Sequence, residues 1–238
     1  VRDYLLKHAY GNADTKDLWV SLEKISKQPV PQLMDGWIFQ PGYPLVTAEI
    51  DKSGRLALSQ QRFNYLPSPS PLPPHSSPAT WQIPIQMRVT AGGKPDTLRM
   101  SLTEKNMTVP LPHDWESIFL NEEGHGFYRV RYAPDLLDRL LKCGIDRLAV
   151  TERFNLINDA WAITIAGHMP LTDYLDLTAR FTTERDKNVW AVLLDSFSFL
   201  NRIVTVEDRS ALEAFVRSRI GPAVSDLGWE PRSGESEL

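Results

Sequence analysis

Apolar residues recur at a helical spacing through residues 1–40. Asp14 or Thr15 can cap a helix, because a short polar side chain at that position accepts a hydrogen bond from the backbone of the first turn. The apolar side chains that follow lie on one face of the expected helix: Leu18, Trp19, Leu22 and Ile25. A second short helix is expected from about residue 30, and Pro41-Gly42 should end it.

At Tyr43 the period changes to two residues, which predicts β-strands. Alternating apolar side chains mark segments at 46–50, 56–65, 81–89, 98–102, 107–111 and 126–132. Turn-forming residues separate them, such as "DKSG" at 51–54 and "AGGKPD" at 91–96. About six or seven short strands connected by turns favour an antiparallel β-sandwich.

Helical spacing returns beyond Ala133. Pro134 suits the first turn of a helix, and Gly144 suits its end. Thr151 can cap the next helix, and later helices are expected to begin near Thr172, Asn188 and Val206. Consecutive helices with short connections favour an antiparallel array of the solenoid kind.

A proline-rich tract, "LPSPSPLPPHSSP" at 66–78, interrupts the predicted strands. Such segments often space two domains. However, the strands that precede it amount to little more than a hairpin, which cannot form an independent core. We therefore expect the tract to be a loop within the sandwich, and we divide the chain into a helical segment (1–40), a sandwich (41–133) and a helical array (134–238).

Composition narrows the class of protein. With 42% hydrophobic and 24% charged residues, the 238-residue chain is typical of soluble folded proteins. A net charge of −4 without long blocks of one sign argues against nucleic acid as a partner. No apolar window approaches the roughly 18–20 residues that cross a bilayer. Cys143 is the only cysteine, so no intrachain disulfide is expected, which favours a reducing compartment and a cytoplasmic location.

The sequence carries little that suggests chemistry. Its five histidines are scattered, without a His-Glu-x-x-His motif or a helical pair that could hold a metal. Glu122, Glu123 and His125 stand together in "EEGHGF" and could in principle do acid–base work, but a polar turn that leads into a strand explains the same residues. Arg180, which precedes the charged turn "TTERDK", is the one side chain that we expect to face a cavity and to contact substrate.

A series of motifs, in one order, adds to this interpretation. Helical segments contain "YLLKHAYGNADTKDLWVSLEKIS", "PVPQLMDGWIFQPGYPLV" and "RFNLINDAWAITIAGHMPLTDYL", and strand segments contain "LSQQRF", "TWQIPI" and "NEEGHGFYRVRY". Together they cover essentially the whole chain. The series closely resembles zinc aminopeptidases of the alanyl and puromycin-sensitive type, the gluzincin aminopeptidases.

The resemblance implies a multidomain α+β fold: the closing helices of a thermolysin-like catalytic domain at 1–40, an antiparallel β-sandwich, and an incomplete helical array. The family's zinc ligands and general-base glutamate lie in His-Glu-x-x-His and a later glutamate, its amino-group site in Gly-x-Met-Glu-Asn, and a tyrosine stabilises the oxyanion. None has a matching position here, so no catalytic or metal-binding residue carries over. We expect a sequence cut at both ends.

On this interpretation the chain is the non-catalytic C-terminal portion of an enzyme that removes N-terminal amino acids from peptides. Zinc would belong to the parent enzyme, and this chain would supply a spacer and part of the cover of the active-site chamber. One alternative is a stand-alone or degenerate scaffold or binding module with the same fold. Another is an unrelated hydrolase that uses Glu122, Glu123 and His125.

Overall fold

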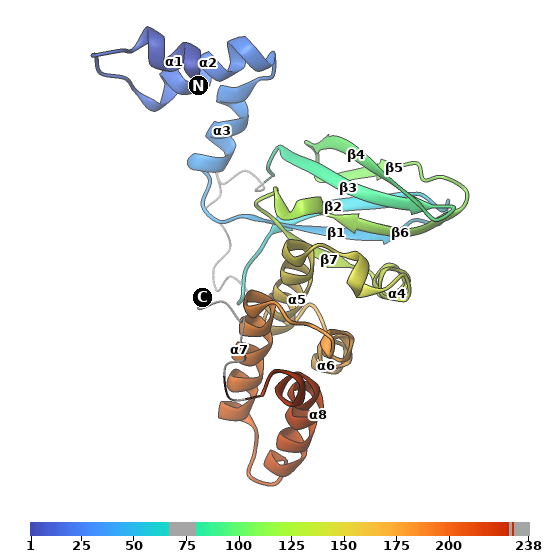
Figure 1. Cartoon of the computed structure of the whole chain (residues 1–238). Helices are drawn as coiled ribbons and strands as arrows, with labels where there is room; N and C mark the ends of the chain where they lie inside the picture. The colour runs from blue at the N-terminus through green and yellow to red at the C-terminus, as the bar shows by residue number, and fades with distance from the viewer. Residues whose placement is uncertain (67–79, 229, 231–238) are drawn as a thin grey trace.

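The computed structural model describes residues 1–66, 80–228 and 230. Three helices come first in the chain: α1 (Arg2–Lys7), α2 (Thr15–Ser26) and α3 (Val30–Ile38). They form an arm, residues 2–38, that extends away from two β-sheets (Figure 1). Asp14 caps α2 as predicted, through a capping box in which Asp14 N–H donates to Asp17 Oδ2 at 2.9 Å. The second helix that the sequence predicted, from about residue 30, corresponds to α3, which ends at Ile38, before Pro41-Gly42.

The strands form two sheets. The first has the order β5-β2-β1-β7, and the second has the order β4-β3-β6. Their bounds are β1 Pro44–Ile50, β2 Leu56–Arg62, β3 Ile83–Ala91, β4 Lys94–Leu102, β5 Asn106–Val109, β6 Trp115–Leu120 and β7 Arg129–Tyr132. Their inward side chains share one buried core. Face-to-face packing of two sheets confirms the expected sandwich at this level.

The expectation of a wholly antiparallel sandwich is wrong for one pair of strands. β7 pairs with β1 in parallel, with Leu45 opposite Arg129 and Ala48 opposite Tyr132. A parallel pair needs a crossover rather than a hairpin. The chain meets that need because β3, β4 and β6 of the other sheet intervene between β1 and β7.

Strand β6 escaped the sequence analysis because it lacks alternation. Its last four residues, from Ser117 to Leu120, are all buried. One side of β6 pairs into the sandwich with β3, and helix α4 packs against it as well. The predicted turn at 91–96 is also shorter than expected: only Gly92 and Gly93 have positive φ, and β4 begins at Lys94.

Five helices follow the sandwich: α4 (Pro134–Lys142), α5 (Val150–Ile165), α6 (Leu171–Thr178), α7 (Lys187–Ile203) and α8 (Arg209–Leu227). They confirm a helical second half. The cap of α5 is Ala149 rather than Thr151, because the Glu152 carboxylate accepts the Ala149 N–H at 2.9 Å. The last helix begins at Arg209, slightly beyond the predicted Val206.

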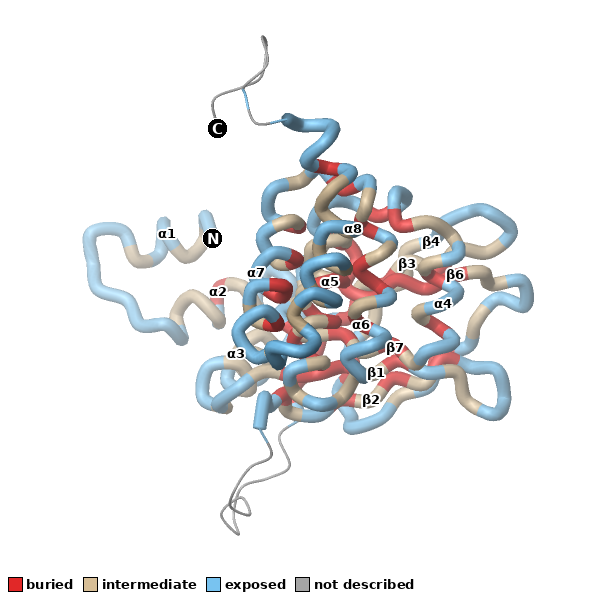
Figure 2. Tube along the Cα trace, turned by 90° about the horizontal axis from the view of Figure 1, so that it is seen from below, coloured by how far each residue is buried: buried red, intermediate tan, exposed pale blue. Residues whose placement is uncertain are grey.

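A single buried cluster runs from the sandwich into the helices (Figure 2). It includes Val46 and Ile85 of the sheets, Leu136 of α4, Ile157 of α5 and Phe197 of α7. The domain divisions at residues 40 and 133 therefore stay predictions. The proline-rich tract lies outside the described residues apart from Leu66. No described helix is both long and apolar enough to cross a bilayer.

One buried glutamine connects the two sheets. Gln60 of β2 accepts the Trp81 N–H at 2.8 Å and donates to the Trp81 and Glu104 carbonyls at 2.9 and 3.0 Å. Its side chain thereby satisfies backbone groups that no strand ladder reaches. Gln61, the next residue, is exposed.

We predict that Gln60→Leu lowers the free energy of unfolding by about 2–4 kcal/mol, because several buried backbone groups lose their partner. Gln61→Leu is the matched control and should change it by less than about 0.5 kcal/mol. Urea denaturation of the three proteins measures both effects. Equal midpoints for the two variants would contradict the connecting role of Gln60.

Candidate functional site

The "EEGHGF" cluster forms a tight turn between β6 and β7. Asn121, Glu123 and Gly124 all have positive φ, at 57°, 59° and 75°. The Asn121 side chain stabilises the turn: its Oδ1 accepts the Gly126 N–H at 2.6 Å and its Nδ2 donates to the Gly126 carbonyl at 3.0 Å. A Cβ on Gly126 would lie 2.1 Å from the Tyr128 ring, so only glycine fits there.

Glu122 belongs to a buried ionic network. Arg88 of β3 donates from Nη1 to Glu122 Oε1 at 3.2 Å. The same guanidinium forms a bidentate pair with Glu152 of α5, at 2.9 and 2.7 Å. Glu152 also accepts the backbone N–H groups of Glu123 and Ala149, at 3.2 and 2.9 Å. Thus one arginine connects the sandwich, the turn and the first long helix; we name Arg88, Glu122 and Glu152 the Arg88 network.

Pairing with each other favours the charged forms of Arg88 and Glu152. Burial raises the pKa of Glu152, but the hydrogen bonds from Arg88, Ala149 and Glu123 outweigh burial, so that the pKa lies below its usual value. The hydrogen bond to Glu152 raises the pKa of Arg88 in turn. A buried carboxylate without its arginine would face a large desolvation cost. The network is therefore structural: it couples α5 to the sheet.

A second ionic contact joins the same helix to the other sheet. Asp159 of α5 accepts Arg129 Nη1 and the Val130 N–H, both at 2.9 Å. Burial raises the pKa of Asp159 to about 7, although the Val130 N–H and Arg129 act in the opposite direction. Arg129 also donates from Nε to the Tyr43 hydroxyl at 3.2 Å. Helix α5 is consequently held at both sheets of the sandwich.

The remaining members of the cluster offer little catalytic capacity. Glu123 and His125 pair with each other at 2.8 Å, and both side chains are about two-thirds exposed. Catalytic zinc usually takes about three protein ligands and an open position. Within residues 1–66, 80–228 and 230, no three His, Cys, Asp or Glu side chains group as a metal site. The described residues therefore do not fit a zinc ion, and no step through zinc is assigned to this chain.

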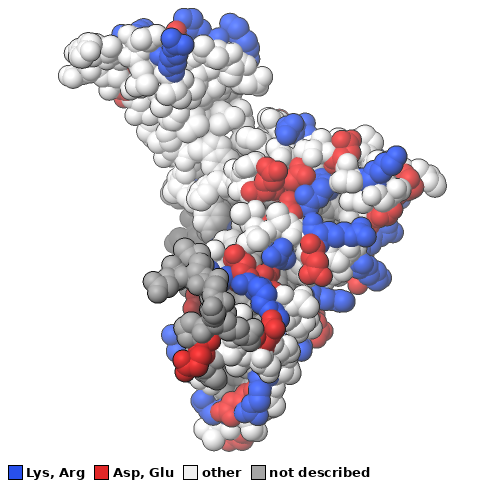
Figure 3. Space-filling view, viewed as in Figure 1, with Lys and Arg blue, Asp and Glu red and all other residues white. Residues whose placement is uncertain are grey.

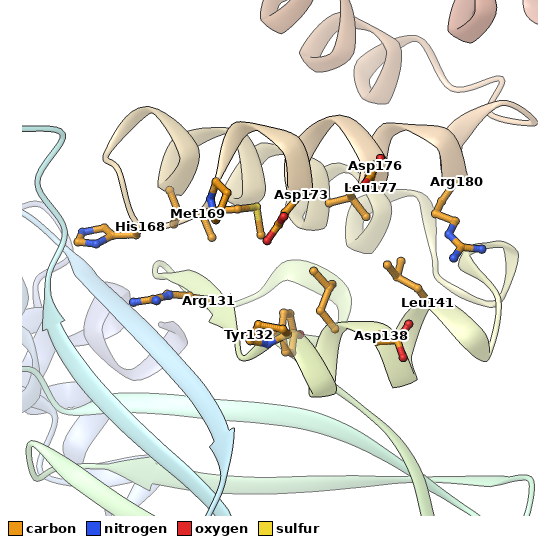
Figure 4. Close-up of a pocket in the computed structure, with 14 residues that line it drawn as sticks. Arg131, Tyr132, Asp138, Leu141, His168, Met169, Asp173, Asp176, Leu177 and Arg180 are labelled. Carbon is orange, nitrogen blue, oxygen red and sulfur yellow. The ribbon is translucent and has the colours of Figure 1, made fainter. Parts of the chain in front are cut away.

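Arg180 lies on the lining of a cavity of about 330 Å³ between α4 and α6 (Figure 4). The floor of the cavity is apolar: Tyr132, Leu137, Leu141, Met169 and Leu177. Arg180 and Asp176 lie toward one end and Arg131 and His168 toward the other. Neither Arg131 nor Arg180 has an ion-pair partner among the described residues. Contact of Arg180 with substrate stays a prediction.

The sequence analysis did not identify Arg88, Arg129, Glu152 or Asp159 as a set. Arg129 and Asp159 lie in quoted motifs and Glu152 lies next to one, but the pairs join positions that are 30 to 64 residues apart. Only one local signal was available: a glutamate three residues after Ala149, which is typical of a helix start. Glu152 at this position indicates a helix cap, but it does not indicate that Arg88 pairs with it.

Comparisons with known proteins support the family resemblance that the sequence motifs indicate. Residues 117–238 match the family model described as ERAP1-like C-terminal domain. The chain is 31% identical over 249 residues to Aminopeptidase M1-A of Oryza sativa subsp. japonica, covering 99% of this chain and 27% of that protein. It is 32% identical over 237 residues to glutamyl aminopeptidase of Rattus norvegicus, covering 95% and 24%. It is also 31% identical over 258 residues to Aminopeptidase M1 of Arabidopsis thaliana, covering 99% and 28%. The chain thus spans only about a quarter of the length of these relatives.

We predict that Arg88→Met destabilises the fold by about 3–5 kcal/mol, because it leaves Glu152 and Glu122 buried without a cation. Lys94→Met is the control, since Lys94 lies on the neighbouring strand β4 and is exposed. It should cost less than about 0.5 kcal/mol. Guanidinium chloride denaturation compares the two, and similar losses would exclude a special role for the Arg88 network.

Proposed function

Because this chain belongs to the M1 aminopeptidases, the family that carries the ERAP1-like C-terminal domain, we propose that it is a non-catalytic portion of a zinc-dependent enzyme that removes N-terminal amino acids from peptides. In this proposal the zinc site lies in the parent enzyme, outside this chain. The sandwich acts as a spacer, and α4–α8 supply part of the cover over the chamber in which peptides are cleaved.

The proposal rests on the structural role of Glu122, which is buried against Arg88. In a hydrolase built on "EEGHGF", Glu122 would have to reach a substrate. Instead, Glu122 is buried and paired with Arg88, and the neighbouring Glu123 N–H is bound by Glu152. The Glu122 side chain and the Glu123 backbone are thereby engaged in attaching the helices to the sandwich, as a spacer with an attached cover requires.

Zinc, when bound in the parent enzyme, would activate a water molecule for attack on the peptide carbonyl. The residues of this chain would act on the substrate in a different way, by enclosing it. The cavity at Arg180 is one place where a long peptide could meet the cover, because its floor is apolar and its rim is charged. The cytoplasmic location expected from the single cysteine remains a prediction.

The first test uses the 238-residue chain itself. Purified protein should release no chromophore from aminoacyl reporter substrates, with or without added zinc, since the described residues hold no group of three metal ligands and Glu122 is paired with Arg88. Glu122→Gln and His125→Ala variants serve as controls for contaminating activity. Zinc-dependent turnover that these variants abolish would support the unrelated hydrolase and overturn the proposal.

The second test concerns Arg180 in the longer aminopeptidase that contains this chain. Arg180→Ala should lower kcat/KM for long peptides relative to aminoacyl reporters by about two- to five-fold, the size expected for an exposed charged contact. Lys187→Ala, which removes a nearby exposed charge outside the cavity, is the matched control. An unchanged ratio across peptide lengths would remove Arg180 from the substrate path.

A further inference from the structure

An open cavity of about 380 Å³ lies between the tight turn after β6 and the beginnings of two long helices. It is lined by Glu123 and Gly124 of the turn, by the first two turns of α5, and by Asn188 in the first turn of α7. Helix α5 packs against both the turn and α7, so three separate elements meet here (Figure 1). We name this cavity the Asn155 groove, and its volume lies within the range of ordinary ligand sites.

Two side chains that line the Asn155 groove are carboxamides without a hydrogen-bond partner among the described residues. The Asn155 side chain is half-buried and the Asn188 side chain is exposed, and neither contains a polar atom that is shut off from solvent. By contrast, the carboxamide of Asn121 is fully engaged with the backbone of Gly126. Asn155 and Asn188 therefore keep their capacity to donate and accept for a ligand.

The turn leaves room for the Asn155 carboxamide. A Cβ on Gly124 would lie 2.7 Å from Asn155 Nδ2, which is closer than such atoms approach in proteins. Gly124 also has a φ of 75°, a conformation that other residues rarely adopt. The lack of a side chain at Gly124 is therefore what allows the Asn155 carboxamide to lie against the turn, at the lining of the groove.

The rest of the lining is close to neutral. Glu123 is the one charged residue among the described residues that line the groove, and its carboxylate already pairs with His125 at 2.8 Å. Val150 is exposed and Phe154 is half-buried, so both offer apolar surface. On the visible face of the molecule, acidic and basic side chains are intermixed over the sandwich and the helices (Figure 3). These features favour a ligand that combines neutral polar groups with apolar parts over a strongly charged one.

The two carboxamides match the groups of a peptide main chain. A carboxamide donates from Nδ2 and accepts at Oδ1 at the same time, and each peptide unit offers one C=O and one N–H. We propose that the Asn155 groove binds the main chain of an extended peptide through Asn155 and Asn188, with apolar side chains of the peptide on Val150 and Phe154. The assignment rests on the function proposed above: the peptide would be a substrate held against the cover by groups that all peptides share. The groove would consequently hold peptides of different sequence.

Nuclear magnetic resonance of the intact 238-residue chain, with isotope-labelled asparagine, tests the proposal directly. The probe is N-acetyl-tetra-alanine amide, which is uncharged and whose amino group is blocked against aminopeptidases. The side-chain NH2 signals of Asn155 and Asn188 should shift on titration, and that of Asn12, an exposed residue of the arm, should not. The same peptide with N-methylated peptide bonds should bind about ten-fold more weakly, because it lacks the donors. Unmoved Asn155 and Asn188 signals, or equal binding of the methylated peptide, would overturn the proposal.

Leucine variants keep the test independent of folding. Asn155→Leu should weaken binding of the acetylated peptide by about five- to ten-fold, and Asn188→Leu by about two- to five-fold, since each removes one polar contact of similar size. Asn188 is exposed, so its replacement should leave the urea midpoint unchanged. Asn12→Leu is the matched control and should alter neither quantity. Unchanged affinity in both groove variants would exclude the two carboxamides as the binding groups.

Kinetics of the longer aminopeptidase that contains this chain distinguish a bound substrate from a segment of the enzyme itself. Asn188→Leu should raise KM for long peptides by about two- to five-fold and leave kcat unchanged, as expected when an interaction is equal in ground state and transition state. Aminoacyl reporters should be unaffected. If the enzyme's own chain fills the groove, KM stays the same and the assignment to substrate is wrong. Peptide binding by the 238-residue chain requires no hydrolysis, so a failure here is distinct from a failure of the proposed function.

Discussion

A charge that leaves water must be paired, and this constraint governs how the two halves of the chain meet. Arg88 lies on the outer face of its strand, where solvent would normally hydrate it. The turn after β6 and the start of α5 cover that face instead, so each must bring a carboxylate to the guanidinium. One side chain on β3 thereby connects η1 (Glu122–Gly124) with the start of α5. The unusual backbone at Glu123 follows from the same requirement, since it directs an N–H to Glu152.

The local pattern of apolar and polar residues predicted those helices and strands whose place in the chain depends on that pattern. The alternating strand through Ile85 and the helix at Pro134 were found because each has one buried and one solvated face. The helix capped at Asp14 was found from its cap and the spacing of its apolar residues, although Ser21 is its one buried residue. Strand β6 was missed because both of its faces are covered, which removes the alternation. The parallel partner of β1 was missed for a different reason: strand direction follows from the route of the chain through space, and no residue of β7 encodes it.

The candidate site shows the same difference between features that the local sequence predicts and features that depend on residues far apart in the chain. The sequence drew attention to Glu122, Glu123 and His125, and favoured a polar turn over a catalytic cluster. The structure agrees about the turn, but the physical reason lies in residues that are remote in sequence. Arg88 precedes Glu122 by 34 residues and Glu152 by 64. Spacing rules describe ligands on one helix or one loop, so a contact that spans three elements has no periodic signature.

The parallel pairing of β1 with β7 bears on how this protein is made. During synthesis, β1 emerges first, and its partner on one side, β7, emerges only after the other sheet has been completed. Until then β1 presents an unpaired edge, and such edges are templates for association with other chains. Pairing of segments this distant also slows folding, since loop closure precedes the contacts that reward it. The edge of β1 is thus most exposed to misassembly before Tyr132 has been synthesised.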